Sequence, residues 1–192
     1  HLIIDIDNKD DFESEKFKSS DVAIEFTSPE SVLDNLSCCF DREVPVVAGT
    51  TGWHENLDRV IEECYSKNQA LFYASNFSIG VNIFFAVNKY LAEIMNSFEE
   101  YNVSISETHH TQKLDAPSGT AISLADILIK SLNKKHSCKL DKDVNASEIA
   151  IEAIREGDVK GIHEILYDSE IDTINLRHSA KTRKGFAQGA VL

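Results

Sequence analysis

The stretch Val44-Pro-Val-Val-Ala-Gly-Thr-Thr-Gly-Trp53 decides the fold of the first part of the chain. Its apolar residues predict a strand over 44–48 that stops at Gly49, and a helix is expected over 55–67. Further strands are expected at 2–6, 22–26 and 70–73, and Pro29 is expected in the first turn of the helix after the second strand. Strands that alternate with helices favour a parallel sheet, so this part predicts an α/β, Rossmann-like doubly wound fold.

The second part of the chain has a different pattern. A densely apolar stretch at 81–95 predicts a long helix buried between layers. Alternation at Val103, Ile105 and Glu107 predicts a strand. We then expect a helix over 120–132, a polar surface linker over 133–145, and strands over 149–155, 162–167 and 172–179. Short turns such as 156–158 indicate antiparallel neighbours, so we expect an α+β domain with a mixed, mostly antiparallel four-stranded sheet.

Composition limits the classes of partner. The chain has 192 residues and a net charge of −13, which disfavours binding to nucleic acid or to anionic membranes. No apolar run is long enough for a membrane span, and no signal peptide pattern is visible. The four cysteines, Cys38, Cys39, Cys64 and Cys138, have no metal-binding spacing, so we expect free thiols and a cytoplasmic location.

The strongest chemical motif is Glu107-Thr-His-His-Thr-Gln-Lys-Leu-Asp-Ala-Pro-Ser-Gly-Thr120. It runs from a predicted strand into the start of a predicted helix. Free N–H groups at a helix start can bind a carboxylate. His109 or His110 can exchange a proton near neutral pH, and Lys113 can hold a carboxylate or donate a proton. The segment therefore predicts an anion site beside a proton donor, although a surface loop with a Ser118 cap is the plainer alternative.

Three weaker motifs point to a nucleotide. The turn after the 44–48 strand lets the backbone approach a flat ring closely at Gly49, although Thr50 and Thr51 could simply cap a helix. In the stretch 74–82, Asn76 could bond to a carboxamide and Phe77 could pack on a ring, although an interdomain turn explains it equally well. Asp5 ends a predicted strand, where an acidic residue commonly accepts the ribose hydroxyls of NAD; it favours NADH over NADPH, and Lys9 could offset that.

Two further features concern ions. Residues 177–184 are basic and no acid follows Ile174, so this run is either a solvated face or lies near an anionic ligand, and Arg155, Gly161 and His163 could face the same cleft. We expect no metal site, because neighbours in a strand point to opposite faces and His109 and His110 could not easily share an ion.

Together these segments closely resemble the dihydrodipicolinate reductase family (4-hydroxy-tetrahydrodipicolinate reductases) of bacterial lysine and diaminopimelate biosynthesis. The most specific match is the string His-His-x-x-Lys-x-Asp-Ala-Pro-Ser-Gly-Thr, residues 109–120. The match extends over nearly the whole chain, and its other carriers are residues 24–27, Pro29-Glu30, 49–53, 76–82, Arg155 with Gly157, 161–163, 178–183, Phe186-Ala187 and Gly189-Ala190.

The resemblance implies a two-domain enzyme, a homotetramer that uses NADH or NADPH and acts on a small dicarboxylate. It implies that His109 is the proton donor, that Lys113 is a second catalytic group that also binds a substrate carboxylate, and that His110 contacts substrate. It implies a carboxylate site at Gly119 and Thr120. The implied cofactor contacts, together with Asp5 from its position, are Phe26, Thr27, Gly49, Thr50, Thr51, Ala74, Ser75, Asn76 and Phe77.

We accordingly expect a nucleotide-binding domain at residues 1–76, a substrate-binding and oligomerisation domain at 77–183, and at 184–192 the start of a helix that returns to the first domain. The family's Gly-rich turn is absent from this chain, so on the order of 30 residues are expected before it. Hinges near Asn76 and Arg183 would let the domains approach.

Two alternatives remain. Another dehydrogenase of an amino-acid pathway predicts no His-His-x-x-Lys string and often has a catalytic cysteine. A non-catalytic ligand-binding relative would tolerate the loss of His109 or Lys113, and both are present.

Overall fold

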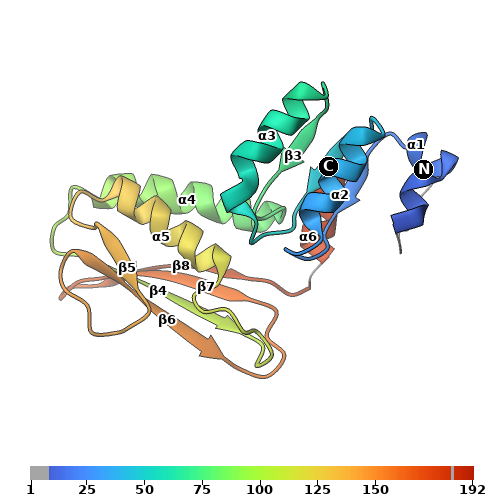
Figure 1. Ribbon diagram of the computed structural model, residues 1–192. Helices are drawn as coiled ribbons and strands as arrows, with labels where there is room; N and C mark the ends of the chain where they lie inside the picture. Colours follow the sequence, from blue (N-terminus) through green and yellow to red (C-terminus); the bar gives the residue numbers. More distant parts are fainter. Residues whose placement is uncertain (1–8, 183) are drawn as a thin grey trace. The chain divides into compact units, whose positions relative to one another are not determined.

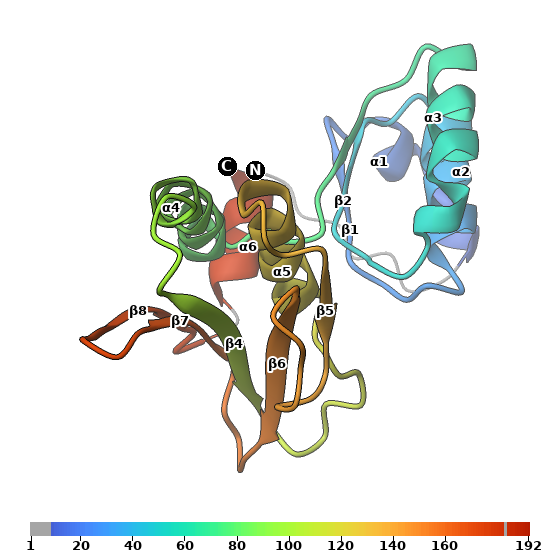
Figure 2. The same cartoon turned by 90° about the vertical axis from the view of Figure 1, so that its left-hand side faces the viewer.

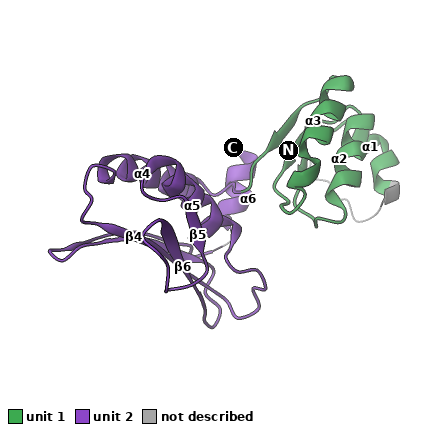
Figure 3. Ribbon diagram, turned by 60° about the vertical axis from the view of Figure 1, so that its left-hand side comes forward, with its two compact units in different colours: residues 1–75 green, residues 76–192 purple. Residues whose placement is uncertain are grey.

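The computed structural model describes residues 9–182 and 184–192, and the chain divides into two compact units, residues 1–75 and 76–192 (Figure 3). The strand expected at 2–6, Asp5, and the hinge expected at Arg183 lie outside the described residues. Within the described residues, no helix has both the length and the apolar composition needed to cross a lipid bilayer.

The first unit contains a three-stranded parallel sheet in the order β1-β2-β3. Its elements are η1 (Lys9–Glu13), α1 (Glu15–Lys18), β1 (Ala23–Glu25), α2 (Val32–Asp41), β2 (Val46–Ala48), η2 (His54–Asn56), α3 (Leu57–Ser66) and β3 (Leu71–Tyr73). Apolar residues recur every four positions in α2, at Val32, Leu36 and Phe40, and pack with β2 in one core. The predicted parallel α/β arrangement is therefore present.

The start of α2 differs from the prediction. Pro29 lies in a turn, and the helix begins only at Val32 after Ser31. The side chain of Ser28 and the turn before the helix are tied to Ser31 by hydrogen bonds, which explains the later start.

The second unit packs helices against a five-stranded sheet. Its elements are α4 (Ile79–Met95), β4 (Asn102–His109), α5 (Gly119–Ser131), β5 (Ser137–Lys139), β6 (Glu148–Arg155), β7 (Ile162–Asp168), β8 (Thr173–Ser179) and α6 (Lys184–Val191). Figures 1 and 2 show α4 and α5 over the same face of this sheet. Inward residues of both helices and of β4, β6 and β7 form one core.

The strand order, β5-β6-β4-β7-β8, corrects three expectations. The sheet has five strands rather than four, because β5 lies inside the stretch predicted as a linker. It is not mostly antiparallel, since β5–β6 and β6–β4 are parallel while β4–β7 and β7–β8 are antiparallel. The turn at 156–158 does not join neighbours, because β4 lies between β6 and β7.

Helix α4 is not buried on all sides. Its inward face carries Phe84, Asn88 and Ala92, while Ile83 and Tyr90 are exposed by 59% and 67%. The prediction of a helix enclosed between layers was therefore wrong, although the helix itself spans nearly the expected residues.

Candidate active site

Strand β4 carries the core into the site. Its buried residues alternate along one face: Val103 and Ile105 lie in the apolar core, and Glu107 and His109 continue the same face. Glu107 is 0% exposed and His109 is 8% exposed. Because side chains two apart in a strand share a face, the carboxylate and the imidazole are placed side by side under the start of α5.

Glu107 is surrounded by donors. The backbone N–H of Ser118 donates to both carboxylate oxygens, at 3.0 and 3.2 Å. Arg155 Nη2 lies 3.4 Å from Oε1, while His163 Nε2 and His109 Nδ1 lie 3.6 and 3.7 Å from Oε2. Burial alone would raise the pKa of Glu107, but hydrogen bonds from His163 and Ser118 outweigh it and lower the pKa to about 2. The carboxylate is therefore ionised at neutral pH.

The His109 ring lies between this carboxylate and a glycine. Nδ1 faces Glu107, whereas a Cβ built on Gly161 would lie 3.3 Å from Nε2. The His163 ring meets it edge-on, with ring centroids 5.0 Å apart. Burial lowers the pKa of His109 to about 4, and the charge of Glu107 opposes this shift. An unliganded His109 is thus mostly neutral, and a nearby anion would be needed to charge it.

The loop between β4 and α5 is held by Arg155. The guanidinium donates to the backbone oxygens of Lys113 and Asp115, at 3.3 and 2.6 Å, while also reaching Glu107. Lys113 Nζ donates to both carboxylate oxygens of Asp115, at 2.8 and 2.9 Å. Asp115 therefore helps to order the loop through Lys113. Half-buried His110 lies at the start of this loop, and its backbone oxygen accepts from Lys113 N at 3.1 Å.

The start of α5 is the predicted anion site. Ser118 caps the helix, its Oγ accepting from Ala121 N at 3.2 Å, and the same Oγ lies 3.2 Å from His163 Nε2. The N–H groups of Gly119 and Thr120 are left without an acceptor inside the helix. A Cβ built on Gly119 would meet nothing within 4 Å, so this end of the helix is open to a ligand. A helix start of this kind favours a carboxylate.

Asn76 lies beside this helix start. Its Nδ2 donates to Thr120 Oγ1 at 3.4 Å, and its Oδ1 accepts from Ser78 N at 2.9 Å. The residue expected to contact the cofactor is thus hydrogen-bonded to one expected to contact substrate. Phe77 is buried, half-buried Ala74 continues from β3, and Ser75 is exposed.

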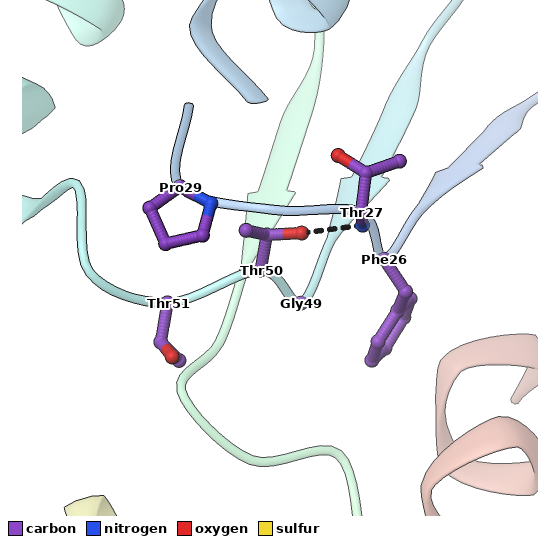
Figure 4. Close-up of a pocket in the computed structure, with 6 residues that line it drawn as sticks. All are labelled: Phe26, Thr27, Pro29, Gly49, Thr50 and Thr51. Atoms are coloured by element: carbon purple, nitrogen blue, oxygen red, sulfur yellow. Dashed lines mark hydrogen bonds between the residues drawn. The ribbon is translucent and has the colours of Figure 1, made fainter. Parts of the chain in front are cut away.

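The other cofactor candidates gather at the carboxyl ends of β1 and β2. Phe26, Thr27, Pro29, Gly49, Thr50 and Thr51 line a hollow of about 240 Å³ (Figure 4). Thr27 N donates to Thr50 Oγ1 at 2.7 Å, which joins the two loops. A Cβ on Gly49 would collide with the Phe26 ring, so a side chain fits here only if that ring moves. This hollow stands where doubly wound folds bind ligands, and these residues fit a dinucleotide.

The basic run lies partly around a second hollow. Arg177 pairs with Glu164 across β7 and β8, at 3.4 Å, so it is partly neutralised. The end of β8 and the start of α6 enclose about 400 Å³, lined by Ser78, His178, Ser179, Ala180, Lys181, Thr182, Lys184, Gly185, Phe186 and Gln188. The basic run 177–184 thus contains Arg177, which is ion-paired, and Lys181 and Lys184, which line the second hollow.

Arg155, Gly161 and His163 were expected to share a cleft with the basic run 177–184, and the structure places all three against Glu107 or His109. It did not assign a role to Glu107, although the alternation from Val103 to His109 could have indicated its burial. It also did not consider that Glu107, His109 and His163 each offer a metal-ligand atom, all within 4.8 Å of one another. Arg155 and Ser118 already compensate the same carboxylate, which favours a hydrogen-bonded cluster.

Comparisons with known proteins agree with this geometry. Residues 4–77 match the family model "Dihydrodipicolinate reductase, N-terminus", and residues 80–192 match "Dihydrodipicolinate reductase, C-terminus". A 4-hydroxy-tetrahydrodipicolinate reductase of Christiangramia forsetii is 46% identical over 190 residues, which cover 98% of this chain and 77% of the relative. One from Methanosarcina acetivorans is 36% identical over 195 residues, covering 100% of this chain and 73% of the relative.

A solved structure is also similar. The dipicolinate-bound dihydrodipicolinate reductase of Paenisporosarcina sp. TG-14 has a TM-score of 0.66 at 28% identity, covering 89% of this chain and 66% of that one. The resemblance inferred from residues 109–120 is confirmed by these matches over both units. The chain therefore belongs to the dihydrodipicolinate reductase family of oxidoreductases.

Proposed function

We propose how the described residues carry out the reaction of this family, the NADH- or NADPH-dependent reduction of 4-hydroxy-tetrahydrodipicolinate in lysine and diaminopimelate biosynthesis. One substrate molecule, one hydride and one proton give tetrahydrodipicolinate, and the 4-hydroxyl leaves as water. Bound NADH or NADPH supplies the hydride. The chain must therefore hold a dianion and deliver a proton beside the reacting ring.

One substrate carboxylate binds at the start of α5. The N–H groups of Gly119 and Thr120 donate to it, and the helix dipole favours its charge. Lys113 Nζ, now held by Asp115 at 2.8 Å, takes a carboxylate of the substrate, and His110 adds a contact from the same loop. These groups lie on one strand–loop–helix segment, so the ring is fixed relative to His109.

His109 donates the proton. Its Nε2 is the atom nearest Gly161, while Nδ1 faces Glu107. A dianion beside the ring favours imidazolium, which offsets the burial that otherwise holds its pKa at about 4. The observation that carries this assignment is the shared contact of His109 and of the α5 start with one buried carboxylate.

We propose that the dinucleotide binds in the hollow shown in Figure 4. Phe26, Thr27, Gly49, Thr50 and Thr51 form its rim, and Gly49 brings the backbone close to a ligand. Ala74 to Phe77 add the loop whose Asn76 is bonded to Thr120.

Activity assays test the roles. NADH oxidation is followed with enzymatically generated substrate, and His109→Ala and Lys113→Ala are compared with the exposed controls His136→Ala and Lys130→Ala. We expect His109→Ala mainly to lower kcat, by about 10²-fold or more, and Lys113→Ala to raise KM as well. Wild-type activity in both site variants would remove the assigned roles.

We also propose a cytoplasmic homotetramer. The four cysteines are free, as expected in a reducing compartment. The face of the five-stranded sheet away from α4 and α5 carries the apolar side chains Ile154, Ile162 and Leu166, of which Ile154 is 39% exposed. Pairing such faces between copies would bury them.

A further inference from the structure

We propose that Glu107 is a positioning residue for the reduction: its carboxylate keeps a proton on His109 Nδ1, leaves Nε2 for the substrate, and anchors the helix start that binds the substrate carboxylate. One buried charge would then control the protonation of the proton donor and hold the anion site in place. The inference rests on the proposed role of His109 and adds a residue to which no function is otherwise assigned.

The strand register places Glu107 at the centre of the site. In the central strand β4, Glu107 lies directly across from His163 in β7, and His109 lies directly across from Arg155 in β6. Both neighbouring strands therefore contribute a side chain to the Glu107 carboxylate. Because β4 is hydrogen-bonded on both sides, the backbone cannot shift to bring a different group under α5.

The two carboxylate oxygens have different neighbours. Ser118 N donates to both, at 3.0 Å to Oε1 and 3.2 Å to Oε2, while Arg155 Nη2 lies near Oε1, and these contacts tie the carboxylate to the α5 start and to the loop. Oε2 lies between the two imidazoles, 3.7 Å from His109 Nδ1 and 3.6 Å from His163 Nε2. Among the described residues, His109 Nδ1 is buried and has no hydrogen bond within the usual distance. A buried imidazole nitrogen facing a carboxylate is expected to carry the proton, because a bare nitrogen there would repel it.

The charges around His109 make this carboxylate decisive. The groups that act on its ring are Glu107 from β4, Arg155 from β6, His163 from β7 and Lys113 from the loop. Arg155 and Lys113 are cations, and Lys113 is paired with Asp115 at 2.8 Å, whereas Glu107 is the anion that raises the pKa of His109. Removing the Glu107 charge takes away this support, so protonated His109 becomes less favourable. The pKa of His109 in the substrate complex should then fall.

The carboxylate also has a mechanical task. Its two contacts with Ser118 N fix the first turn of α5, and Arg155 links it to the backbone of Lys113 and Asp115. A charge-neutral amide of the same shape would keep one acceptor for Ser118 N. Glutamine therefore separates the electrostatic task from the mechanical one, whereas alanine removes both.

Kinetics against pH test the electrostatic task. Glu107→Gln and Glu107→Asp are compared with Glu156→Gln, an exposed residue whose backbone N–H donates to the His109 oxygen. We expect Glu107→Gln to lower kcat about tenfold or more and to move the alkaline decline of kcat to lower pH by about one unit. Glu107→Asp should keep that decline near its wild-type position, and Glu156→Gln should change neither quantity. An unmoved decline in Glu107→Gln would reduce Glu107 to a structural residue.

A spectroscopic readout is independent of activity. Ring ¹⁵N spectra of His109 in the wild-type protein should show a neutral ring protonated at Nδ1, and in Glu107→Gln its pKa should be lower. A neutral ring protonated at Nε2 overturns the proposal, even if the variant fails to fold. Shifts of a metal-bound imidazole that disappear with a chelator would overturn it as well. If His109→Ala retains full activity, the proton-donor role fails, whereas these spectra still decide whether Glu107 controls the ring.

Discussion

Gly161 lies against the imidazole of His109, so closely that a Cβ on Gly161 would stand 3.3 Å from Nε2 and 3.5 Å from Cδ2. The backbone of Gly161 has φ +143°, a conformation that residues with a side chain rarely adopt. Its backbone oxygen also accepts from Ala180 N at 2.8 Å, which joins β7 to the end of β8. The positive φ therefore favours glycine here, and the narrow space beside His109, the proposed proton donor, leaves little room for a side chain.

Gly161→Ala should impair catalysis more than stability alone explains. The added methyl group displaces His109, and a displaced proton donor costs about tenfold or more in kcat. Backbone strain should also lower the melting temperature by several degrees, roughly 1–2 kcal/mol. Gly157→Ala is the matched control, since Gly157 has φ +46° and a Cβ there meets nothing within 4 Å. Equal losses of kcat in both variants would contradict the role assigned to the Gly161–His109 contact.

Ser118→Ala should lower the stability of helix α5 and weaken the binding of substrate. The variant removes the cap on Ala121 N and the contact with His163, which costs about 1 kcal/mol of stability. Since the first turn of α5 also binds the carboxylate, KM should rise with a smaller effect on kcat. Ser123→Ala, in the same helix, removes only a bond to the Gly119 oxygen and serves as the control. An unchanged KM in Ser118→Ala would argue against a carboxylate site at this helix start.

Stability should fall as the pH drops below about 6.5. Burial lowers the pKa of His109 from 6.5 to about 4, so in this window the unfolded chain binds a proton that the folded chain rejects. His178, whose pKa burial also lowers, adds to the trend. The contribution of Glu107, with its pKa lowered from 4.5 to about 2, is present above 4.5 and is lost only at more acidic pH.

Thermal melting between pH 4 and 7 measures this dependence. His109→Gln should flatten the slope without abolishing it, whereas exposed His136→Gln should leave it unchanged. Parallel curves for wild type and His109→Gln would mean that the imidazole is not held neutral in the folded protein.

Gly49→Ala should damage the cofactor hollow. The new methyl group collides with the Phe26 ring, so either this ring or the loops after β1 and β2 must move. We expect KM for NADH to rise at least about tenfold, equivalent to roughly 1.4 kcal/mol, with less change for the dicarboxylate. Combining Gly49→Ala with Phe26→Ala removes the clash and should restore part of the stability lost in the single variant, which a double-mutant cycle would detect.

Leu166→Arg should break the proposed tetramer. Leu166 lies on the sheet face opposite the helices, between Ser104 and Asn175 of the neighbouring strands. A charge there would be buried unpaired if this face pairs with another copy. Light scattering should show a smaller species with unchanged circular dichroism, while Tyr65→Arg, at a position 81% exposed in α3, should remain tetrameric. A monomeric wild type would refute the assembly itself.

The sequence predicted the helices and strands better than it predicted which strands pair with each other. Period-two alternation identified β4, because its inward face is buried throughout. It could not identify β5, which has only three residues in a polar, lysine-rich stretch and exists through its pairing with β6. Nor could it show that β4 inserts between β6 and β7, since a short turn at Gly157 suits a hairpin equally well. Strand order depends on contacts between distant residues, which no local pattern records.

The site shows the same division. The proximity of His109, Lys113 and the helix start followed from their closeness in the sequence. The role of Glu107 did not, because a glutamate in an alternating strand is ordinarily read as solvent-facing. Its burial depends on Arg155 and His163, which arrive from strands distant in the sequence.

His109, the proposed proton donor, lies on the central strand β4, which is hydrogen-bonded to β6 and β7 on either side. Central strands of a sheet open only when the whole cooperative unit opens. The backbone amides of β4 around His109 should therefore be among the slowest in this unit to exchange with deuterium. On heating, activity should then be lost abruptly, when the whole unit melts. Local unfolding at the edges of the sheet should not inactivate the site before that point.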